Sequence, residues 1–428
     1  MDITITPRPL SGRISVPSSK SMTHREFICA ALAEGESCID NVSLSDDITA
    51  TASCMAALGA DIEEIPSAFP GRRAYRIRGG VGPRGCPLSL DCGESGSTLR
   101  FLIPIGIYSG NTVTFTGRGR LAERPLTPYH DLFKEKGISC EADGGLPLTV
   151  SGTLESGVYR LPGDVSSQFF TGLLFVLPLL PGDSLLESAT PLESGSYIDM
   201  TLECMARHGV SVRKEAPGRY VIPGGQSYRA GDFSVEGDYS QAAFWLAAGL
   251  LGGSIAASGL SADSTQGDRV IADILRRMGG RLDREGQDLA ARPSALCGTV
   301  IDAEDCPDLV PVLAALAAVS RGRTEIIHAA RVRLKECDRL HAMAEELRRL
   351  GADIAENPDG LVIEGLPSLS GGAADAWNDH RIAMALAAVS SRCSGPLTIR
   401  GADCVSKSYP AFWKDFASLG GELRRSDR

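Results

Sequence analysis

One pattern of apolar and polar residues recurs six times along the chain. Each copy consists of the end of an amphipathic helix, a glycine, and a short strand in which apolar and polar residues alternate. The glycines stand at positions 59, 137, 209, 279, 351 and 420, so successive copies are 78, 72, 70, 72 and 69 residues apart. A glycine suits the left-handed backbone conformation that closes a helix. The near-constant spacing predicts six copies of one unit of about 70 residues.

A unit of this length can hold two helices and several strands, and three such units suffice for a domain. The 428 residues therefore predict two similar domains of the α/β (α+β) class. No linker rich in Pro or Ser marks the boundary, and the segment 236–238, just past the third copy, is the natural break. The alternating start, residues 1–6, predicts a strand and not a signal peptide.

Composition excludes several classes of function. The 53 Asp and Glu residues outnumber the 43 Lys and Arg residues, and the net charge of -10 argues against nucleic acid or an anionic membrane as partner. Any anionic ligand must therefore be held by a local cluster of cations. The most apolar stretch, residues 169–180, is too short to span a bilayer. Twelve cysteines without a C-x-x-C pair, and six histidines without an H-x-x-x-H pair, predict reduced thiols in a cytoplasmic protein and no metal site.

Polar clusters precede several of the apolar helical runs, at residues 18–21, 93–98, 166–168, 305–308, 378–381 and 406–408. Ser, Asp and Asn commonly cap helices, which explains most of these residues. Three of the clusters also carry a cation that opposes the helix dipole unless a bound anion offsets it: Lys20, Arg381 and Lys407. Lys335 and Arg339, four residues apart, would share one face of a further helix, in which Glu336 can be a capping acid. Together these clusters predict a site for a polyanion.

Five segments together resemble the EPSP synthase (3-phosphoshikimate 1-carboxyvinyltransferase) family of enolpyruvyl transferases. They are residues 17–25 (PSSKSMTHR), 163–169 (GDVSSQF), 236–240 (EGDYS), 333–339 (RLKECDR) and 378–381 (NDHR). The last two are specific in combination. The resemblance implies two similar domains, each of three β-α-β-α-β-β repeats that form an inside-out α/β barrel, with the N-terminal strand in the domain of the C-terminal half.

The expected domains are residues 20–237, and residues 1–19 together with 238–428. By resemblance, the first mainly binds shikimate 3-phosphate. The second supplies phosphoenolpyruvate contacts and acid-base residues, and the active site lies in the cleft between the two domains.

The resemblance also implies the reaction. The enolpyruvyl (1-carboxyvinyl) group of phosphoenolpyruvate passes to the 5-hydroxyl of shikimate 3-phosphate by addition and elimination, and phosphate is released. This step belongs to the shikimate pathway of aromatic amino-acid biosynthesis. It requires no metal and no organic cofactor. The expected partners are the two small-molecule substrates, without nucleic acid or membrane, and the expected state is a monomer.

The resemblance assigns site residues position by position. The shikimate 3-phosphate site takes Ser21, Arg25, Ser166, Ser167, Gln168, Ser194, Tyr197, Asp308 and Lys335. The phosphoenolpyruvate site takes Lys20, Gly96, Arg124, Gln168, Arg339, Arg381 and Lys407. Asp308 is the expected base near the hydroxyl, and Glu336 is the expected acid near the methylene. Lys20 would assist proton transfer, and His380 would orient Glu336 or the ligand.

The chain departs from the family pattern at a few positions. The family often has Asn-Ala-Gly-Thr where this chain has residues 94–97, Glu-Ser-Gly-Ser. Glu94 places a negative charge beside an expected anion site, so it either points away or weakens phosphoenolpyruvate binding. The response to glyphosate, which competes with phosphoenolpyruvate in this family, is open for that reason. Arg118, Arg120 and Arg331 are further departures.

Two alternatives stay open. The sister transferase that acts on UDP-N-acetylglucosamine has a Lys-Asn start and a reactive loop cysteine, whereas this chain has Lys20-Ser21 and no cysteine in residues 117–125. A catalytically inactive homologue that acts as a binding module is the second alternative. The retained Lys20, Asp308, Glu336 and Arg339 argue against it.

Overall fold

The computed structural model describes residues 1–142, 145–286 and 288–426. The chain divides into two compact units. We call Ser18–Val235 the continuous unit, and Met1–Pro17 together with Glu236–Arg428 the split unit. The bounds expected from the resemblance, 20–237 and 1–19 with 238–428, lie two residues from these at each crossing.

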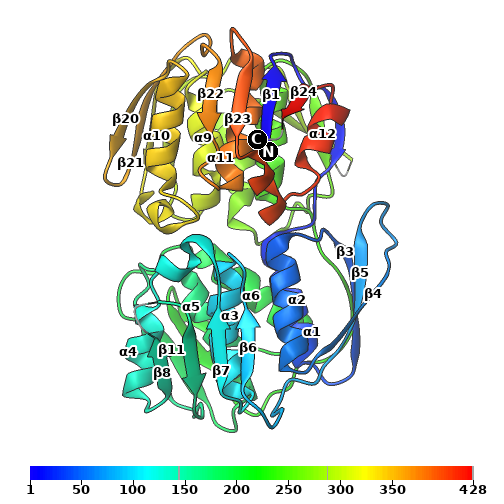
Figure 1. Cartoon of the computed structure of the whole chain (residues 1–428), viewed down its shortest axis with the longest axis vertical. Coiled ribbons are helices and arrows are strands. Elements are labelled where there is room, and N and C mark those ends of the chain that lie inside the picture. The colour runs from blue at the N-terminus through cyan, green and yellow to red at the C-terminus, as the bar shows by residue number, and fades with distance from the viewer. Residues whose placement is uncertain (143–144, 287, 427–428) are drawn as a thin grey trace. The chain divides into compact units, whose positions relative to one another are not determined.

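Within the described residues, each unit contains three four-stranded sheets (Figure 1). In the continuous unit the strand orders are β14 (Asp232–Ser234), β3 (Glu36–Val42), β5 (Arg73–Arg78), β4 (Asp61–Pro66); β6 (Leu88–Asp91), β7 (Val113–Thr116), β9 (Leu148–Ser151), β8 (Ser139–Ala142); and β10 (Val158–Leu161), β11 (Ser184–Ser188), β13 (Arg219–Ile222), β12 (Arg213–Ala216). In the split unit they are β2 (Gly12–Ser15), β15 (Ile255–Ser258), β17 (Asp288–Arg292), β16 (Arg281–Glu285); β18 (Val300–Asp302), β19 (Gly322–Ile327), β21 (Gly360–Gly365), β20 (Asp353–Asn357); and β22 (Gly372–Asp375), β23 (Leu397–Arg400), β1 (Asp2–Thr6), β24 (Glu422–Ser426).

All six sheets share one topology: the first two strands are parallel, and the remaining two neighbours pair antiparallel. Three of the sheets contain one strand that comes from a distant part of the sequence. β14 pairs with β3, and β2 pairs with β15. β1 lies between β23 and β24, with Ile3 opposite Ile399. The N-terminal strand therefore completes the last repeat of the split unit.

Each repeat contributes two α-helices. The first helices are α1 (Lys20–Leu32), α3 (Gly96–Tyr108), α5 (Ser167–Val176), α7 (Tyr239–Leu250), α9 (Val310–Ala317) and α11 (His380–Val389). The second helices are α2 (Asp46–Leu58), α4 (Thr127–Glu135), α6 (Gly195–Arg207), α8 (Ile271–Arg277), α10 (Arg339–Arg349) and α12 (Phe412–Ser418). Short 3-10 helices are η1 (Gly119–Glu123), η2 (Leu177–Leu179), η3 (Gly267–Val270), η4 (Pro307–Leu309), η5 (Ala330–Leu334), η6 (Ser390–Arg392) and η7 (Ala402–Lys407).

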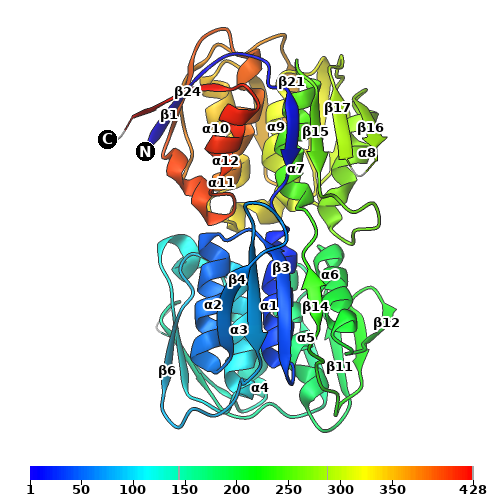
Figure 2. The ribbon, with the colours of Figure 1, turned by 90° about the vertical axis from the view of Figure 1, so that its right-hand side faces the viewer.

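The first helix of each repeat is buried on nearly all sides, whereas the second has an exposed polar face. The buried helices pack on one another: α3 on α5 in the continuous unit, and α11 on α7 and α9 in the split unit. The strands cover them from outside, and Figure 2 shows β3 and β4 in front of α1 and α2. Helices inside and sheets outside confirm the predicted inside-out α/β architecture.

The six glycines of the sequence pattern end the second helix of each repeat. At positions 59, 137, 209, 279, 351 and 420 their φ angles range from 69° to 124°, the left-handed region that L side chains avoid. At the first of them, the amide of Gly59 donates to the carbonyl of Met55 at 3.1 Å. The predicted six-fold repeat is thereby confirmed.

None of the helices in the described residues has the length and apolarity needed to cross a lipid bilayer. All twelve cysteines lie in the described part of the chain, and all are free thiols.

A buried ionic cluster joins α1 to α6. Glu26 on α1 is fully buried, and its two carboxylate oxygens face Arg207 Nη1 at 2.7 Å and His208 Nε2 at 3.0 Å. The other ring nitrogen of His208 lies 3.0 Å from the carbonyl of Arg229. The cluster therefore ties a buried carboxylate of α1 to two side chains at the end of α6.

We expect Glu26→Gln to lower the free energy of unfolding by about 1–3 kcal/mol, because it weakens the hydrogen bonds that a fully buried carboxylate makes to Arg207 and His208. Urea titration followed by circular dichroism measures this. Glu63→Gln is the matched control: Glu63 is 61% exposed and paired to Arg76, so we expect a change below about 1 kcal/mol. Equal effects of the two substitutions would show that the Glu26 cluster contributes no more than a surface ion pair.

Candidate active site

Polar residues start the buried helices of the continuous unit. The hydroxyl of Ser19 accepts from the amide of Met22 at 3.3 Å, that of Ser95 from Thr98 at 3.1 Å, and that of Ser166 from Gln168 at 3.3 Å. Lys20, Gly96 and Ser167 are the first residues of their helices. The prediction that these polar clusters begin helices is confirmed.

Lys20 is held by a carboxylate that sequence reasoning missed. Its Nζ lies 2.6 Å from Oδ2 of Asp47, in the first turn of α2, and the two side chains are 17% and 10% exposed. An ammonium at a helix start is unfavourable in itself, and Asp47 supplies the compensating charge. The pair fixes Lys20 at the start of α1.

Gly96, Arg124 and Gln168 come together, as the resemblance required. A Cβ at Gly96 would lie 2.6 Å from Nη1 of Arg124 and 3.6 Å from Oε1 of Gln168. The side-chain amide of Gln168 donates to Oγ of Ser97 at 2.9 Å and accepts from Nη1 of Arg100 at 2.8 Å. A side chain at position 96 would therefore have to displace the guanidinium of Arg124.

Arg25 is 2% exposed, and each end of its guanidinium has an acceptor within the continuous unit. Nη1 donates to the carbonyl of Ser21 at 2.6 Å, and Nη2 donates to the carbonyl of Tyr197 at 2.8 Å. Nε donates to Oγ1 of Thr201 at 2.9 Å. Burial lowers the pKa of Arg25 to about 10, which leaves it charged at neutral pH. In this structure Arg25 joins α1 to α6, near the helix start where Ser194 has a φ of 55°.

The departures from the family pattern have local partners. The carboxylate of Glu94 faces the backbone at Gly119, where a Cβ would lie 2.8 Å from Oε2. Arg118 lies 3.9 Å from a carboxylate oxygen of Asp91, and Arg120 lies 3.6 Å from one of Glu123. In the split unit, Arg331 donates to the carbonyl of Glu304 at 2.9 Å.

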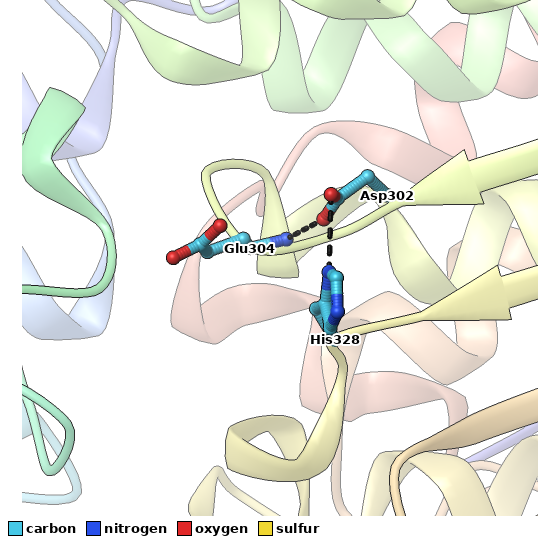
Figure 3. Close-up of side chains that lie close together, drawn as sticks. All are labelled: Asp302, Glu304 and His328. Carbon is cyan, nitrogen blue, oxygen red and sulfur yellow. Dashed lines mark hydrogen bonds and ion pairs between the residues drawn. The ribbon is translucent and has the colours of Figure 1, made fainter. Parts of the chain in front are cut away.

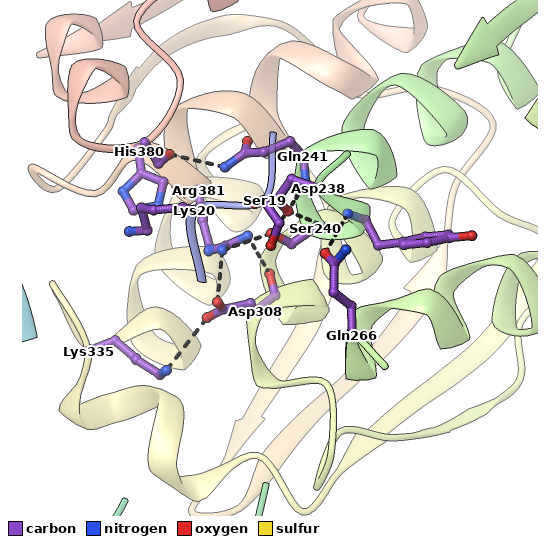
Figure 4. Close-up of polar contacts among 12 residues, drawn as sticks. Ser19, Lys20, Asp238, Ser240, Gln241, Gln266, Asp308, Lys335, His380 and Arg381 are labelled. Carbon is purple, nitrogen blue, oxygen red and sulfur yellow. Dashed lines mark hydrogen bonds and ion pairs between the residues drawn. The ribbon is translucent and has the colours of Figure 1, made fainter. Parts of the chain in front are cut away.

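Asp308 lies at the centre of an ionic cluster in the split unit (Figure 4). Arg381, in the first turn of α11, donates from Nη2 to Oδ2 of Asp308 at 2.8 Å and to Oγ of Ser240 at 3.1 Å. Arg339, the first residue of α10, donates from Nη1 to Oδ1 of Asp308 at 2.9 Å. Lys335 Nζ is 3.6 Å from the same oxygen. Three cations therefore converge on one carboxylate.

Arg339 also connects Asp308 to two more carboxylates. Its Nη2 donates to Oε2 of Glu336 at 2.7 Å, and its Nε donates to Oδ2 of Asp379 at 2.8 Å. Arg339 is 1% exposed and Asp379 is fully buried. The expected acid and the expected base are therefore both bound to one guanidinium.

The cations determine the protonation of Asp308. Burial by itself raises the pKa of Asp308, but Arg381, Lys335 and Arg339 outweigh burial and hold that pKa well below its ordinary value. Burial lowers the pKa of Lys335, and Asp308 opposes this change. Asp308 is thus ionised at neutral pH.

Two local predictions were wrong. Lys335 and Arg339 do not share a helix face, because α10 begins at Arg339 and its N-cap is Asp338, while Lys335 follows η5. The four-residue spacing indicates a shared face only when both residues lie in one continuous helix, and here the helix begins after Lys335. Glu336, likewise, caps no helix.

Lys407 does not begin an α-helix either, because it ends η7 and α12 starts only at Phe412. Its Nζ donates to the carbonyl of Asn378 at 2.7 Å, beside the start of α11. His380, the first residue of α11, is 1% exposed, and its Nδ1 is 3.9 Å from Asp379.

Three exposed side chains at the end of β18 and β19 form a group that sequence spacing did not indicate (Figure 3). Asp302, Glu304 and His328 each offer one potential metal-ligand atom, all within 4.8 Å of one another. However, His328 Nδ1 is 3.0 Å from Asp302, and this hydrogen bond raises the pKa of His328. Exposed acidic groups are common without a metal ion, and we assign no metal to this group.

Sequence reasoning missed Asp47 and Arg100, both of which hold expected substrate-binding side chains. Arg100 binds Gln168 and stacks over Phe169, with its guanidinium carbon 5.0 Å from the ring centroid. A lone arginine inside the apolar run 99–102 was the available signal. For Asp47, a Ser-Asp-Asp run before a helix is typical of capping, so the sequence carried no separate signal for its bond to Lys20.

Comparison with known proteins covers almost the whole chain. A family model described as EPSP synthase (3-phosphoshikimate 1-carboxyvinyltransferase) matches residues 5–416. The 3-phosphoshikimate 1-carboxyvinyltransferase of Clostridium kluyveri is 50% identical over 422 residues, covering 98% of each chain. That of Clostridium acetobutylicum is 47% identical, again over 98% of each chain.

Solved structures agree. EPSP synthase from Acinetobacter baumannii superposes with a TM-score of 0.81 at 26% identity, covering 99% of this chain and 100% of that one. The enolpyruvyl transferase NikO from Streptomyces tendae has a TM-score of 0.80 at 18% identity, over 99% of this chain and 98% of that one, and shows the shared fold. The chain therefore belongs to the EPSP synthase (3-phosphoshikimate 1-carboxyvinyltransferase) family.

Proposed function

We propose that this protein catalyses the reaction of its family, the transfer of the enolpyruvyl group of phosphoenolpyruvate to the 5-hydroxyl of shikimate 3-phosphate, with release of phosphate. The observation that carries the proposal is an ionic cluster. In it, Asp308 and Glu336 both bind Arg339, and Arg381 and Lys335 also pair with Asp308. It combines two potential acid-base groups with cations suited to an anionic substrate.

The proposed chemistry has two steps. In the first, the 5-hydroxyl attacks carbon 2 of phosphoenolpyruvate, its proton passes to Asp308, and Glu336 protonates carbon 3. In the second, the tetrahedral intermediate loses phosphate, which takes up the proton held by Asp308, and a methyl proton returns to Glu336. Lys20 assists proton transfer, and His380 orients its neighbours. Acid-base groups of this kind contribute about 10²–10⁴-fold each to the rate.

The substrate-binding sets remain as the resemblance assigned them. We propose that Arg124, Arg339, Arg381, Lys407 and Lys20 bind phosphoenolpyruvate, because a carboxylate and a phosphate on three carbons need several cations. Gly96 and Gln168 shape that site. For shikimate 3-phosphate we propose Ser21, Arg25, Ser166, Ser167, Gln168, Ser194, Tyr197, Asp308 and Lys335. The start of α5 supports the phosphate contact, since free amides and hydroxyls at a helix N-terminus favour an anion.

We further propose a monomeric, cytoplasmic enzyme of the shikimate pathway that uses no cofactor and binds no nucleic acid. The twelve free thiols support a reducing compartment. Neither a UDP-N-acetylglucosamine transferase nor an inactive homologue has support among the named relatives.

Phosphate release tests the function directly. We expect the purified protein to release phosphate only when both substrates are present, with one enolpyruvyl product formed per phosphate. Phosphate release from phosphoenolpyruvate alone, or with UDP-N-acetylglucosamine as acceptor, would contradict the proposal. Absence of release with any acceptor, in a protein that still binds shikimate 3-phosphate, would favour the inactive homologue.

Glu336→Gln should fold and bind shikimate 3-phosphate, yet lose turnover by at least about 10²-fold, because glutamine cannot exchange a proton. Phosphate release measures turnover, and titration calorimetry measures binding. Glu325→Gln, a change at a side chain that is 39% exposed on β19, should leave both unchanged. Near-normal turnover of Glu336→Gln would remove this residue from its proposed role.

Gly96→Ala should raise the KM for phosphoenolpyruvate by about 10–100-fold, the effect of weakening one charge-assisted hydrogen bond. The new methyl carbon would lie 2.6 Å from Nη1 of Arg124 and displace it. Gly82→Ala, where a Cβ meets nothing within 4 Å, is the matched control. An equal rise in the KM for both substrates would argue against placing Arg124 at phosphoenolpyruvate.

A further inference from the structure

Asp268 on η3 is a buried carboxyl group that the proposed mechanism does not use. It is 7% exposed, and among the residues that the structure describes none hydrogen-bonds to its Oδ1. The other carboxylates near it are partnered: Asp308 by arginines, and Asp238 by Oγ of Ser240 at 2.6 Å. A buried carboxylate without a partner is costly, so this group requires an explanation.

Charged groups face Asp268 from several elements. They are Asp308 at η4, Arg381 on α11, Asp238 at the start of α7, and Lys335 after η5. The buried thiol of Cys306 is a further neighbour. The charged residues of α8, which also packs on η3, are exposed. Both nearby cations already bind Asp308, so an ionised Asp268 would add an uncompensated negative charge beside it.

Protonation resolves this conflict. Burial, with a further contribution from the charge of Asp308, raises the pKa of Asp268 to about 8. Asp268 is then a neutral carboxylic acid at neutral pH, whereas Asp308 stays ionised. Above that pH, an ionised Asp268 would compete with Asp308 for the positive charge of Arg381 and Lys335.

We propose that Asp268 is a positioning residue which, as a neutral carboxylic acid, leaves Arg381 and Lys335 to Asp308 and to the anionic substrate. Its ionisation weakens the binding of phosphoenolpyruvate at alkaline pH. This second part rests on the proposed function, whereas the protonation of Asp268 does not.

The protonation is tested without substrates. The infrared spectrum at neutral pH should contain a protonated carboxyl band that Asp268→Asn removes. Below the ordinary pKa of an aspartate, folded and unfolded chains both bind this proton; between about pH 4 and about 8 only the folded chain does, so stability falls as pH rises. Asn carries no such proton. The thermal midpoint of Asp268→Asn should therefore exceed that of the wild type by more at about pH 8 than at about pH 5.

The effect on the substrate is tested with the phosphate-release assay between about pH 7 and 9.5. For the wild type, the KM for phosphoenolpyruvate should rise above about pH 8 by up to tenfold per pH unit, which is the limit for one ionisation. Asp268→Asn should keep the neutral-pH KM and show a flatter rise. Lys335 is present in both proteins, so its own loss of charge cancels in the comparison. Asp263→Asn, an exposed change five residues away, should follow the wild type.

Each result supports or overturns one part of the proposal. If Asp268→Asn loses the infrared band but its KM profile runs parallel to that of the wild type, Asp268 is a neutral carboxyl that does not affect substrate binding. No band in the wild type, or a difference in thermal midpoint between Asp268→Asn and the wild type that is the same at about pH 5 and about pH 8, would overturn the neutral carboxyl itself. If the wild type lacks activity with both substrates, the proposed function fails, while the spectral and thermal results still decide the protonation.

Discussion

Carboxylates surround the buried cation Arg339, and that pairing organises the split unit's candidate site. Arg339 is 1% exposed and binds Asp308, Glu336 and Asp379. Removing a guanidinium from water is unfavourable, and these three carboxylates supply the compensating charge. An anion that binds there must compete with carboxylates already in place. Affinity for such an anion therefore depends on how these carboxylates share their cations, and not only on how many cations are present.

The repeat architecture explains why polar residues gather at helix starts. Each first helix is buried on nearly all sides, and its polar residues are concentrated in its N-terminal half. The starts of α3 and α5 meet through Gln168 and Ser97, and those of α7 and α11 meet through Arg381 and Ser240. Free backbone amides at such starts add to the cations in favouring anions. Burial of the first helices forms the core of each unit. It therefore also concentrates hydrogen-bond donors at the N-terminal ends of these helices.

The sequence predicted the repeat, the apolar helical runs and most helix starts because those features depend on neighbouring residues, whereas the inside-out arrangement came from the family resemblance. Glycines at regular positions and serines before apolar runs act within a few residues of chain. Sequence reasoning failed where the partner of a side chain comes from a distant part of the chain. The bond between Lys20 and Asp47 joins two helices, and the isolation of Asp268 depends on groups from several elements. Lys335 was misplaced because a four-residue spacing indicates a shared face only if the helix is continuous.

The low pKa of Asp308 stands against its proposed role as base. Arg381, Lys335 and Arg339 hold that pKa well below its ordinary value, and a carboxylate so stabilised accepts a proton poorly. The same cations are those proposed to bind the anionic substrates. When a substrate's negative groups take up part of their charge, Asp308 loses stabilisation and its pKa rises. A base of this kind is weak in the empty protein and strengthens only when the anions are bound, so binding and proton transfer are coupled through shared counter-ions.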